Sequence, residues 1–181
     1  HYDHMDKDTL KYVINRDNPI CIAGLGTQLL LNQWGCKTVI GLDWYDQYQI
    51  NSLLRVTFMP AHHFSSRGLF DKNQSLWGGL MIHYNNQHQL YYAGDTGYSP
   101  IFQKIASQYS TIDLSILPIS VYESSEPLKS THLSPSESVH VHKELGSKQS
   151  LATHWGTFKL SKESLYQPIE ALNQAKKDQG L

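Results

Sequence analysis

The chain opens with His1-Tyr2-Asp3-His4, which places two imidazoles and a carboxylate within four positions. Imidazole nitrogen and carboxylate oxygen are donor types that Zn²⁺ accepts in proteins, and Mn²⁺ or Fe²⁺ accept them as well. A short loop can direct all three donors toward one small volume without helical geometry. The pattern therefore predicts a metal-binding turn at the start of the chain.

Three further segments offer ligands at the ends of expected strands. His62 and His63 follow a segment that Pro60 ends, Asp95 lies in the run Ala-Gly-Asp-Thr-Gly, and His154 precedes Trp-Gly. Sites in α/β proteins usually assemble beyond the strand ends, and neighbouring glycines let the backbone approach an ion closely. The chain holds ten histidines, and these positions favour a shared metal site for several of them.

The elements that must position these residues follow an α/β pattern. We expect a helix up to about residue 15, capped by Asp6 or Asp8. A helix at 27–34 then separates two short, β-branched apolar runs at 19–25 and 38–43, which predict buried strands. Strand, helix, strand in this order is typical of an α/β domain.

The remainder of the chain continues this pattern. Ser134-Pro-Ser-Glu137 is a capping box that predicts a helix ending at Gly146. Pro118 lies in the expected strand at 114–119 and favours a position near a sheet edge or a strand end. The long loop at 62–75 is of a kind that is usually functional. The other expected elements are one or two strands in 48–59, a hairpin of 80–84 and 89–93, a helix at 98–109, strands at 114–119 and 150–153, and a helix from 168 to 177.

Composition limits the classes of protein that remain. The 181 residues include 40% hydrophobic and 17% charged side chains, which predicts one globular domain over residues 1–181. The formal net charge is −1 and no run of Lys or Arg forms a basic stripe, so we expect no nucleic-acid partner. Cys21 and Cys36 are too few for a disulfide framework. No window approaches the roughly 20 apolar residues of a membrane span.

The order of these motifs resembles the metallo-β-lactamase superfamily. That family carries His-x-His-x-Asp-His, then a distant His, an Ala-Gly-Asp-Thr-Gly-like segment, and a last distant His. This chain matches the first motif from the family's second His onward, because His1 is its first residue. The resemblance implies a four-layer αβ/βα sandwich with metals at one edge between the sheets. It also implies that residues 1–181 form the larger, C-terminal part of this metallo-hydrolase domain, incomplete at the N-terminus.

Within the superfamily, the chain resembles the branch of N-acyl-phosphatidylethanolamine-hydrolysing phospholipases D. The resemblance implies a zinc-dependent hydrolase, a phosphodiesterase acting on phospholipid-like or other small-molecule diesters. It favours a cytoplasmic or membrane-associated location with peripheral membrane contact, and it leaves the oligomeric state open. The segments that carry the similarity span nearly the whole chain in the same order: 41–44, 60–63, 76–78, 93–98, 118–119, 122–123 and 154–158.

The same resemblance implies the ligands of two metal ions, expected to be Zn²⁺ with Mn²⁺ or Fe²⁺ as alternatives. His1 and His63 would hold one ion together with the family's upstream His. Asp3, His4 and His154 would hold the second, and Asp95 would bridge both. His63 is preferred to His62 because it occupies the ligand position of the family's Pro-Ala-x-His segment.

Catalytic roles are implied for Asp3, Asp95 and His132. His132 matches a family histidine near the substrate, so it would hydrogen-bond a phosphate oxygen or protonate the leaving oxygen. Three alternatives remain: a metal-dependent lactonase, a nuclease of the same superfamily, and a metal-binding remnant without catalysis. A nuclease would need a basic groove, a lactonase would open ring esters, and a remnant would hold one metal ion or none.

Overall fold

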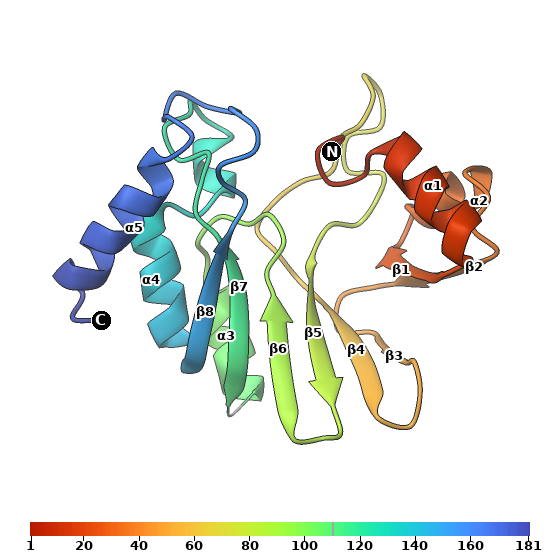
Figure 1. Ribbon diagram of the computed structural model, residues 1–181, viewed down its shortest axis with the longest axis horizontal. Coiled ribbons are helices and arrows are strands. Elements are labelled where there is room, and N and C mark those ends of the chain that lie inside the picture. The colour runs from red at the N-terminus through yellow and green to blue at the C-terminus, as the bar shows by residue number, and fades with distance from the viewer. Residues whose placement is uncertain (110) are drawn as a thin grey trace.

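The computed structural model describes residues 1–109 and 111–181 and contains two β-sheets (Figure 1). The smaller sheet pairs β1 (Ile20–Gly24) with β2 (Thr38–Leu42) in parallel, with Ile20 opposite Thr38. Helix α1 (Lys7–Asp17) precedes β1, and α2 (Gln28–Gln33) connects the two strands. This is the strand, helix, strand unit that the apolar runs predict.

The larger sheet has six strands in the order β3-β4-β5-β6-β7-β8. Strands β3 to β6 are antiparallel neighbours, whereas β6, β7 and β8 run parallel. A crossover links β6 to β7 through α3 (Ile101–Gln108), and another links β7 to β8 through α4 (Pro135–Glu144). The strands are β3 (Gln47–Gln49), β4 (Leu54–Met59), β5 (Gly79–Tyr84), β6 (His88–Tyr92), β7 (Ile112–Pro118) and β8 (Ser147–Thr153).

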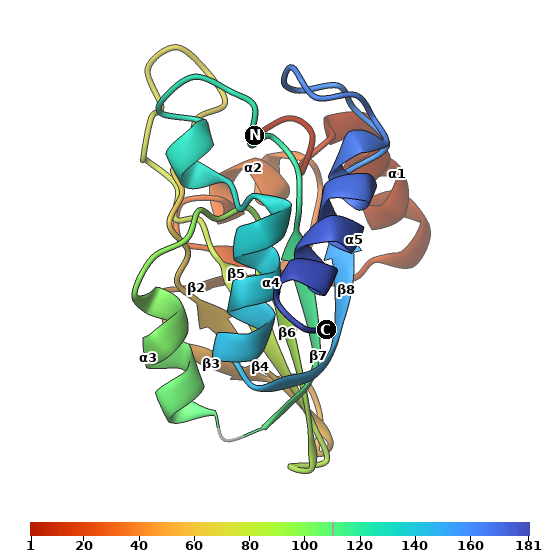
Figure 2. The same ribbon diagram turned by 90° about the vertical axis from the view of Figure 1, so that its left-hand side faces the viewer.

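Helices α3, α4 and α5 (Gln167–Asp178) lie together on the side of the larger sheet that faces the viewer in Figure 2. Phe102 and Ile105 of α3 and Val141 of α4 are fully buried against Met81 and Tyr91 of the sheet. Burying such side chains contributes roughly 1.5–3 kcal/mol each to folding. This core fixes the strand ends that lead into the loops of the site.

A second core holds α1 and α2 on the smaller sheet, through Ile14, Leu31, Trp34 and Cys36. The two sheets face each other closely at Gly24 of β1, where a Cβ atom would lie 2.9 Å from the ring of Phe58 in β4. The layers therefore follow the order helices, sheet, sheet, helices, and the expected αβ/βα sandwich is confirmed.

Helix boundaries follow the capping residues. The Asp6 side chain accepts from the amide of Thr9 at 2.8 Å and starts α1. Ser134 and Glu137 form the predicted capping box of α4, whose helix ends just before Gly146 at φ +60°. None of the helices in the described residues is both long enough and apolar enough to cross a membrane.

Some boundaries differ from the expectation. Helix α3 begins only at Ile101, because Pro100 occupies its N-cap position, and β8 begins at Ser147, before the predicted residue 150. Pro118 is the last residue of β7. Because β7 lies between β6 and β8 in the sheet, Pro118 is at a strand end and not on an edge strand. A short 3₁₀ helix over Lys129–Thr131 was not predicted. It leads directly into His132.

Candidate metal centre

Asp95 is the residue on which the site converges. It follows β6 in a loop that Gly94 enters with φ +66°, and a Cβ atom at Gly94 would lie only 2.8 Å from the carbonyl oxygen of Gly78. A side chain at that position would be strained both by backbone conformation and by contact. Glycine therefore lets the loop pass close to the neighbouring strand and present a carboxylate that is 9% exposed.

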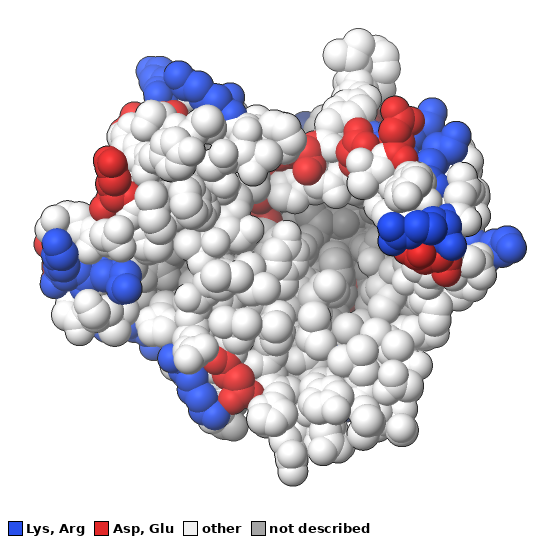
Figure 3. All heavy atoms as spheres, in the orientation of Figure 1, with Lys and Arg blue, Asp and Glu red and all other residues white. Residues whose placement is uncertain are grey.

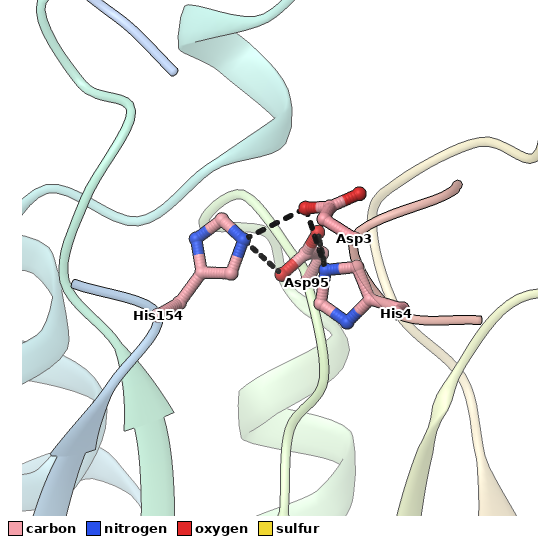
Figure 4. Close-up of side chains that lie close together, drawn as sticks. All are labelled: Asp3, His4, Asp95 and His154. Carbon is pink, nitrogen blue, oxygen red and sulfur yellow. Dashed lines mark ion pairs between the residues drawn. The ribbon is translucent and has the colours of Figure 1, made fainter. Parts of the chain in front are cut away.

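The N-terminal turn brings His4 and Asp3 to this carboxylate. The His4 Nε2 atom lies 2.7 Å from Oδ2 of Asp95 and 3.3 Å from Oδ2 of Asp3. Asp6, which caps α1, anchors the turn immediately after His4. Residues from the first turn of the chain and from the end of β6 thus share one small volume (Figure 4).

His154 completes this group from the end of β8, in the left-handed conformation with φ +59°. Its Nε2 atom lies 3.4 Å from Asp95 Oδ1 and 3.6 Å from Asp3 Oδ2. Both ring nitrogens of His154 are buried and have no hydrogen-bond partner. A buried, unpaired imidazole that faces two carboxylates matches the donor set of a divalent cation. The residues therefore fit a metal ion.

A second group of potential ligands also includes Asp95. Oδ2 of Asp95 lies 3.9 Å from Nε2 of His63 and also 3.9 Å from Nε2 of His132. His1 Nε2 lies 3.1 Å from His63 Nε2 and adds a third imidazole there. The candidate ligand atoms lie within 4.8 Å of one another in the group of Asp3, His4, Asp95 and His154 and in the group of His63, Asp95 and His132. Asp95 is the member that both groups share.

Backbone carbonyl oxygens set the orientation of two of these rings. His63 donates from Nδ1 to the carbonyl oxygen of Thr131 at 3.0 Å, and His132 donates from Nδ1 to that of Leu128 at 2.7 Å. A proton held on Nδ1 leaves the lone pair of Nε2 directed at the centre, as a metal ligand requires. Burial lowers the pKa of His63 to about 4 and also lowers the pKa of His132. Both rings are therefore neutral near pH 7.

Asp3, His4 and Asp95 are charged, in contrast to the neutral rings of His63 and His132. Hydrogen bonds to Asp3 and then Asp95 raise the pKa of His4 to about 10. The rings of His154 and His4 hold the pKa of Asp3 far below its usual range. Burial raises the pKa of Asp95, but the hydrogen bond from His4 and the electrostatic interactions with His154 and His4 outweigh it and lower the pKa. Both carboxylates are therefore anionic and able to bind a cation.

A cavity of about 320 Å³ opens beside the centre, between the two sheets. His4 and Asp95 line one end, and Phe58, Leu76 and Trp77 supply apolar wall. Trp77 donates from Nε1 to the carbonyl oxygen of Ala61 at 3.0 Å, which ties this wall to the segment that leads into His63. The candidate metal centre therefore borders a cavity whose wall contains both polar and apolar side chains.

The structure brings together all the ligands predicted from the sequence, namely His1, Asp3, His4, His63, Asp95 and His154. His62 lies outside both groups, and its backbone pairs with Gly97 instead. His132 is predicted near the substrate but not as a member of a ligand group, and its candidate ligand atom lies within 4.8 Å of those of His63 and Asp95. The carbonyls of Leu128 and Thr131, which orient the rings, were not predicted. Backbone carbonyls leave no signal in a sequence.

Comparisons with known proteins identify two named relatives of this chain. The chain is 33% identical to the mitochondrial N-acyl-phosphatidylethanolamine-hydrolyzing phospholipase D of Saccharomyces cerevisiae over 177 residues, which cover 95% of this chain and 38% of that protein. It is 32% identical to N-acyl-phosphatidylethanolamine-hydrolyzing phospholipase D 1 of Caenorhabditis elegans over 189 residues, which cover 96% of this chain and 52% of that protein. The chain thus spans between 38% and 52% of the length of these relatives.

Solved structures and a family model establish the fold and the family. A metallo hydrolase from the archaeon Ignicoccus hospitalis has a TM-score of 0.71 at 20% identity, covering 97% of this chain and 69% of its own. An isothiocyanate hydrolase from Delia radicum gut bacteria has a TM-score of 0.74 at 15% identity, covering 100% of this chain and 67% of its own. The model of the beta-lactamase superfamily domain matches residues 1–155. The chain therefore belongs to the beta-lactamase superfamily.

Proposed function

We propose that this chain holds two zinc ions and hydrolyses phosphodiesters of phospholipid-like molecules, with residues 1–181 acting as one metallo-hydrolase domain. The observation that carries the proposal is the position of Asp95, whose carboxylate is shared by the two ligand groups. A carboxylate with two oxygens can bind one ion on each side, and two-metal hydrolases use this arrangement.

Each ion would have its own set of ligands. Asp3, His4 and His154 would hold one ion, and His1 and His63 would hold the other, with Asp95 between them. Zinc binds such mixtures of imidazole and carboxylate readily, and Mn²⁺ or Fe²⁺ are the alternatives. When bound, two such ions lower the pKa of water to about 7 and offset negative charge on phosphoryl oxygens.

His132 is proposed to act on the substrate. The carbonyl of Leu128 holds its Nδ1 proton, so Nε2 is the nitrogen that faces the centre. Burial lowers the pKa of His132 and leaves Nε2 unprotonated, so this nitrogen would accept a proton from the attacking water and pass the same proton to the leaving oxygen. Asp3 and Asp95 are proposed to support the same chemistry by holding the ions, because both are anionic in this site.

The substrate class follows from the cavity and the relatives. Apolar wall from Phe58, Leu76 and Trp77 would accept a hydrocarbon portion next to the polar reaction centre. The relatives at 32% and 33% identity are named for hydrolysis of N-acyl-phosphatidylethanolamine. A diester with acyl chains is the substrate that fits both observations.

Metal analysis and turnover test this proposal together. The purified chain is stripped of metal, reloaded with zinc and assayed on bis-p-nitrophenyl phosphate, on N-acyl-phosphatidylethanolamine and on a lactone. We expect two zinc ions per chain and zinc-dependent release of product from both diesters. Turnover of the lactone alone would favour the lactonase alternative. One ion or none, with no turnover of any diester, would favour the non-catalytic remnant and defeat the proposal.

A further inference from the structure

The loop between β4 and β5 ends in two exposed apolar side chains. Leu69 is 92% exposed and Phe70 is 90% exposed, the highest fractions among the large hydrophobic side chains of the described residues. In Figure 1 this loop projects beyond the sheets beside the N-terminal turn, and Figure 3 shows its end as a projection without charged atoms. Exposed apolar groups of this kind usually mark an interaction site.

Hydrogen bonds within the loop fix the backbone that carries these two side chains. Asp71 accepts from the amides of Arg67 and Gly68 at 3.0 and 2.8 Å. Gln74 donates from Nε2 to the carbonyl oxygen of Phe70 at 2.9 Å, and the Asn73 amide donates to Ser65 at 2.7 Å. These bonds fix the backbone at the loop end. Leu69 and Phe70 extend into solvent from this bonded backbone.

The base of the same loop lines the cavity of the metal centre. Phe64, Ser65 and Arg67 border that cavity, together with His63 and Asp95. The Arg67 guanidinium also stacks on Tyr2 at 4.0 Å from the ring centre, which ties the loop to the N-terminal turn. A surface that buries the loop end would therefore lie against the opening of the cavity.

We propose that Leu69 and Phe70, here called the apolar tip, insert into the interface of a lipid bilayer and hold the cavity opening at the headgroups. This rests on the proposed lipid substrate. A large side chain buries roughly 150–250 Å², so the tip supplies far less than the roughly 800 Å² per partner of a stable protein interface. A bilayer, in contrast, accepts single apolar side chains that dip into its boundary region.

The charge next to the tip favours anionic headgroups. Lys72 is exposed and lies two positions after the tip, with its Nζ atom 5.7 Å from the ring of Phe64. Asp71 lies between them and stays anionic, because the amides of Arg67 and Gly68 donate to it and lower its pKa. With Arg67 and Lys72 against Asp71, residues 62–78 carry one net positive charge. Basic side chains beside an apolar anchor strengthen binding to anionic lipids.

Vesicle flotation tests the proposal on the full chain. We compare the wild type with Leu69→Ser/Phe70→Ser and with the control Leu151→Ser, which removes a 58% exposed leucine from β8. Vesicles contain phosphatidylcholine alone or mixed with phosphatidylglycerol. We expect the double variant to bind at least about tenfold more weakly than the wild type and the control to bind like the wild type. Lys72→Gln should weaken binding to the mixed vesicles only.

A second variant keeps the test decisive if the double variant misfolds. Phe70→Trp should show stronger fluorescence quenching by brominated lipids than the wild type, because the added indole would lie within the bilayer boundary. Vesicle binding of the wild type equal to that of the double variant would overturn the proposal. So would dimerisation through the tip without vesicle binding, seen as a change in molecular mass by light scattering.

Turnover separates this inference from the proposed function. Leu69 and Phe70 do not line the cavity, so the double variant should hydrolyse bis-p-nitrophenyl phosphate like the wild type and lose turnover only on vesicles. If the wild type binds vesicles but hydrolyses no diester, the proposed function fails and the docking surface stands. If it hydrolyses the soluble diester but does not bind vesicles, the docking surface fails alone.

Discussion

The Nε2 atom of His4 lies 2.7 Å from Oδ2 of Asp95, which joins the first turn of the chain to the loop after β6. This contact links the layer that contains α1 to the larger sheet across the cavity. Asp95 also faces His154, His63 and His132. Its carboxylate is therefore the point on which both the geometry and the proposed chemistry depend.

Replacing Asp95 by Asn should remove both metal ions, because an amide cannot supply an anionic oxygen to each side. Loss of a residue that only supports a ligand already costs about 10–100-fold in metal affinity, so we expect a loss of more than roughly 100-fold. Equilibrium dialysis with zinc measures it. Asp113→Asn, at a carboxylate that pairs with Lys148 at 2.6 Å on the surface, is the matched control and should bind zinc normally. Unchanged zinc binding by Asp95→Asn would contradict the shared role.

Gly94→Ala should both destabilise the fold and weaken metal binding. The new Cβ atom would meet the Gly78 carbonyl oxygen at 2.8 Å, so the loop must move and carry Asp95 with it. Gly146→Ala is the control, because Gly146 has a similar φ of +60° but no atom within 4 Å of an added Cβ. The left-handed conformation alone costs about 1–2 kcal/mol. Urea unfolding should show a larger loss for Gly94→Ala, and only that variant should lose zinc affinity.

Zinc binding should release a proton from His4. Asp3 and Asp95 raise the pKa of His4 to about 10 without metal, so the ring is protonated at pH 7 and must lose that proton to bind an ion. Apparent affinity should rise with pH over this range, by up to about tenfold per pH unit. Calorimetry in buffers of different ionisation enthalpy counts the protons. The same heat in all buffers would show that no proton leaves.

His132→Ala should retain both zinc ions and lose about 10²–10⁴-fold in turnover, the range expected for loss of a general acid. Metal analysis and hydrolysis of bis-p-nitrophenyl phosphate are measured on the same sample. His88→Ala is the control, because the His88 side chain is 65% exposed and contacts Asp113 instead of the centre. Normal turnover with normal metal content would remove His132 from catalysis, and loss of one ion would identify it as a ligand.

Glu163 should stabilise the fold in a pH-dependent manner. Burial raises the pKa of its carboxyl, but hydrogen bonds from Ser161, the Val121 amide and Ser120 outweigh burial and lower the pKa. A lowered folded pKa means that the stabilisation is present above the unfolded pKa of about 4.5. It is lost as the pH falls through the lower folded pKa.

Glu163→Gln should therefore lose about 1.5–3 kcal/mol of unfolding free energy at pH 7, and its difference from the wild type should shrink in acid. Urea unfolding at a series of pH values measures both quantities. Glu170→Gln, at an exposed position in α5, is the control and should change little. A difference that stays constant down to pH 3 would contradict the role of the charged carboxylate.

Local patterns in the sequence predict much of the fold. The capping box at Ser134 locates α4, and the apolar runs locate β1 and β2, because each depends on interactions within a few residues. The predicted ligands follow from the motifs and from the family resemblance. Their convergence depends on how the two sheets face each other at Gly24 and Phe58, which no local pattern encodes.

The family resemblance predicts His132 near the substrate, but the orientation of its ring could not be predicted. The ring points at Asp95 because the Lys129–Thr131 3₁₀ turn places the Leu128 carbonyl 2.7 Å from Nδ1. That turn has no apolar period and no side-chain cap. His83 is a similar case, since its burial beside Thr57 depends on pairing between β4 and β5. Such positions are decided by tertiary contacts.

The most direct test is the anomalous diffraction of crystals of the zinc-loaded chain, collected above and below the zinc absorption edge. We expect two zinc peaks about 3.5–4 Å apart, one beside His4 and His154 and the other beside His63, with Asp95 between them. A single peak, or peaks that Asp95 does not touch, would rule out a dinuclear site shared by Asp95.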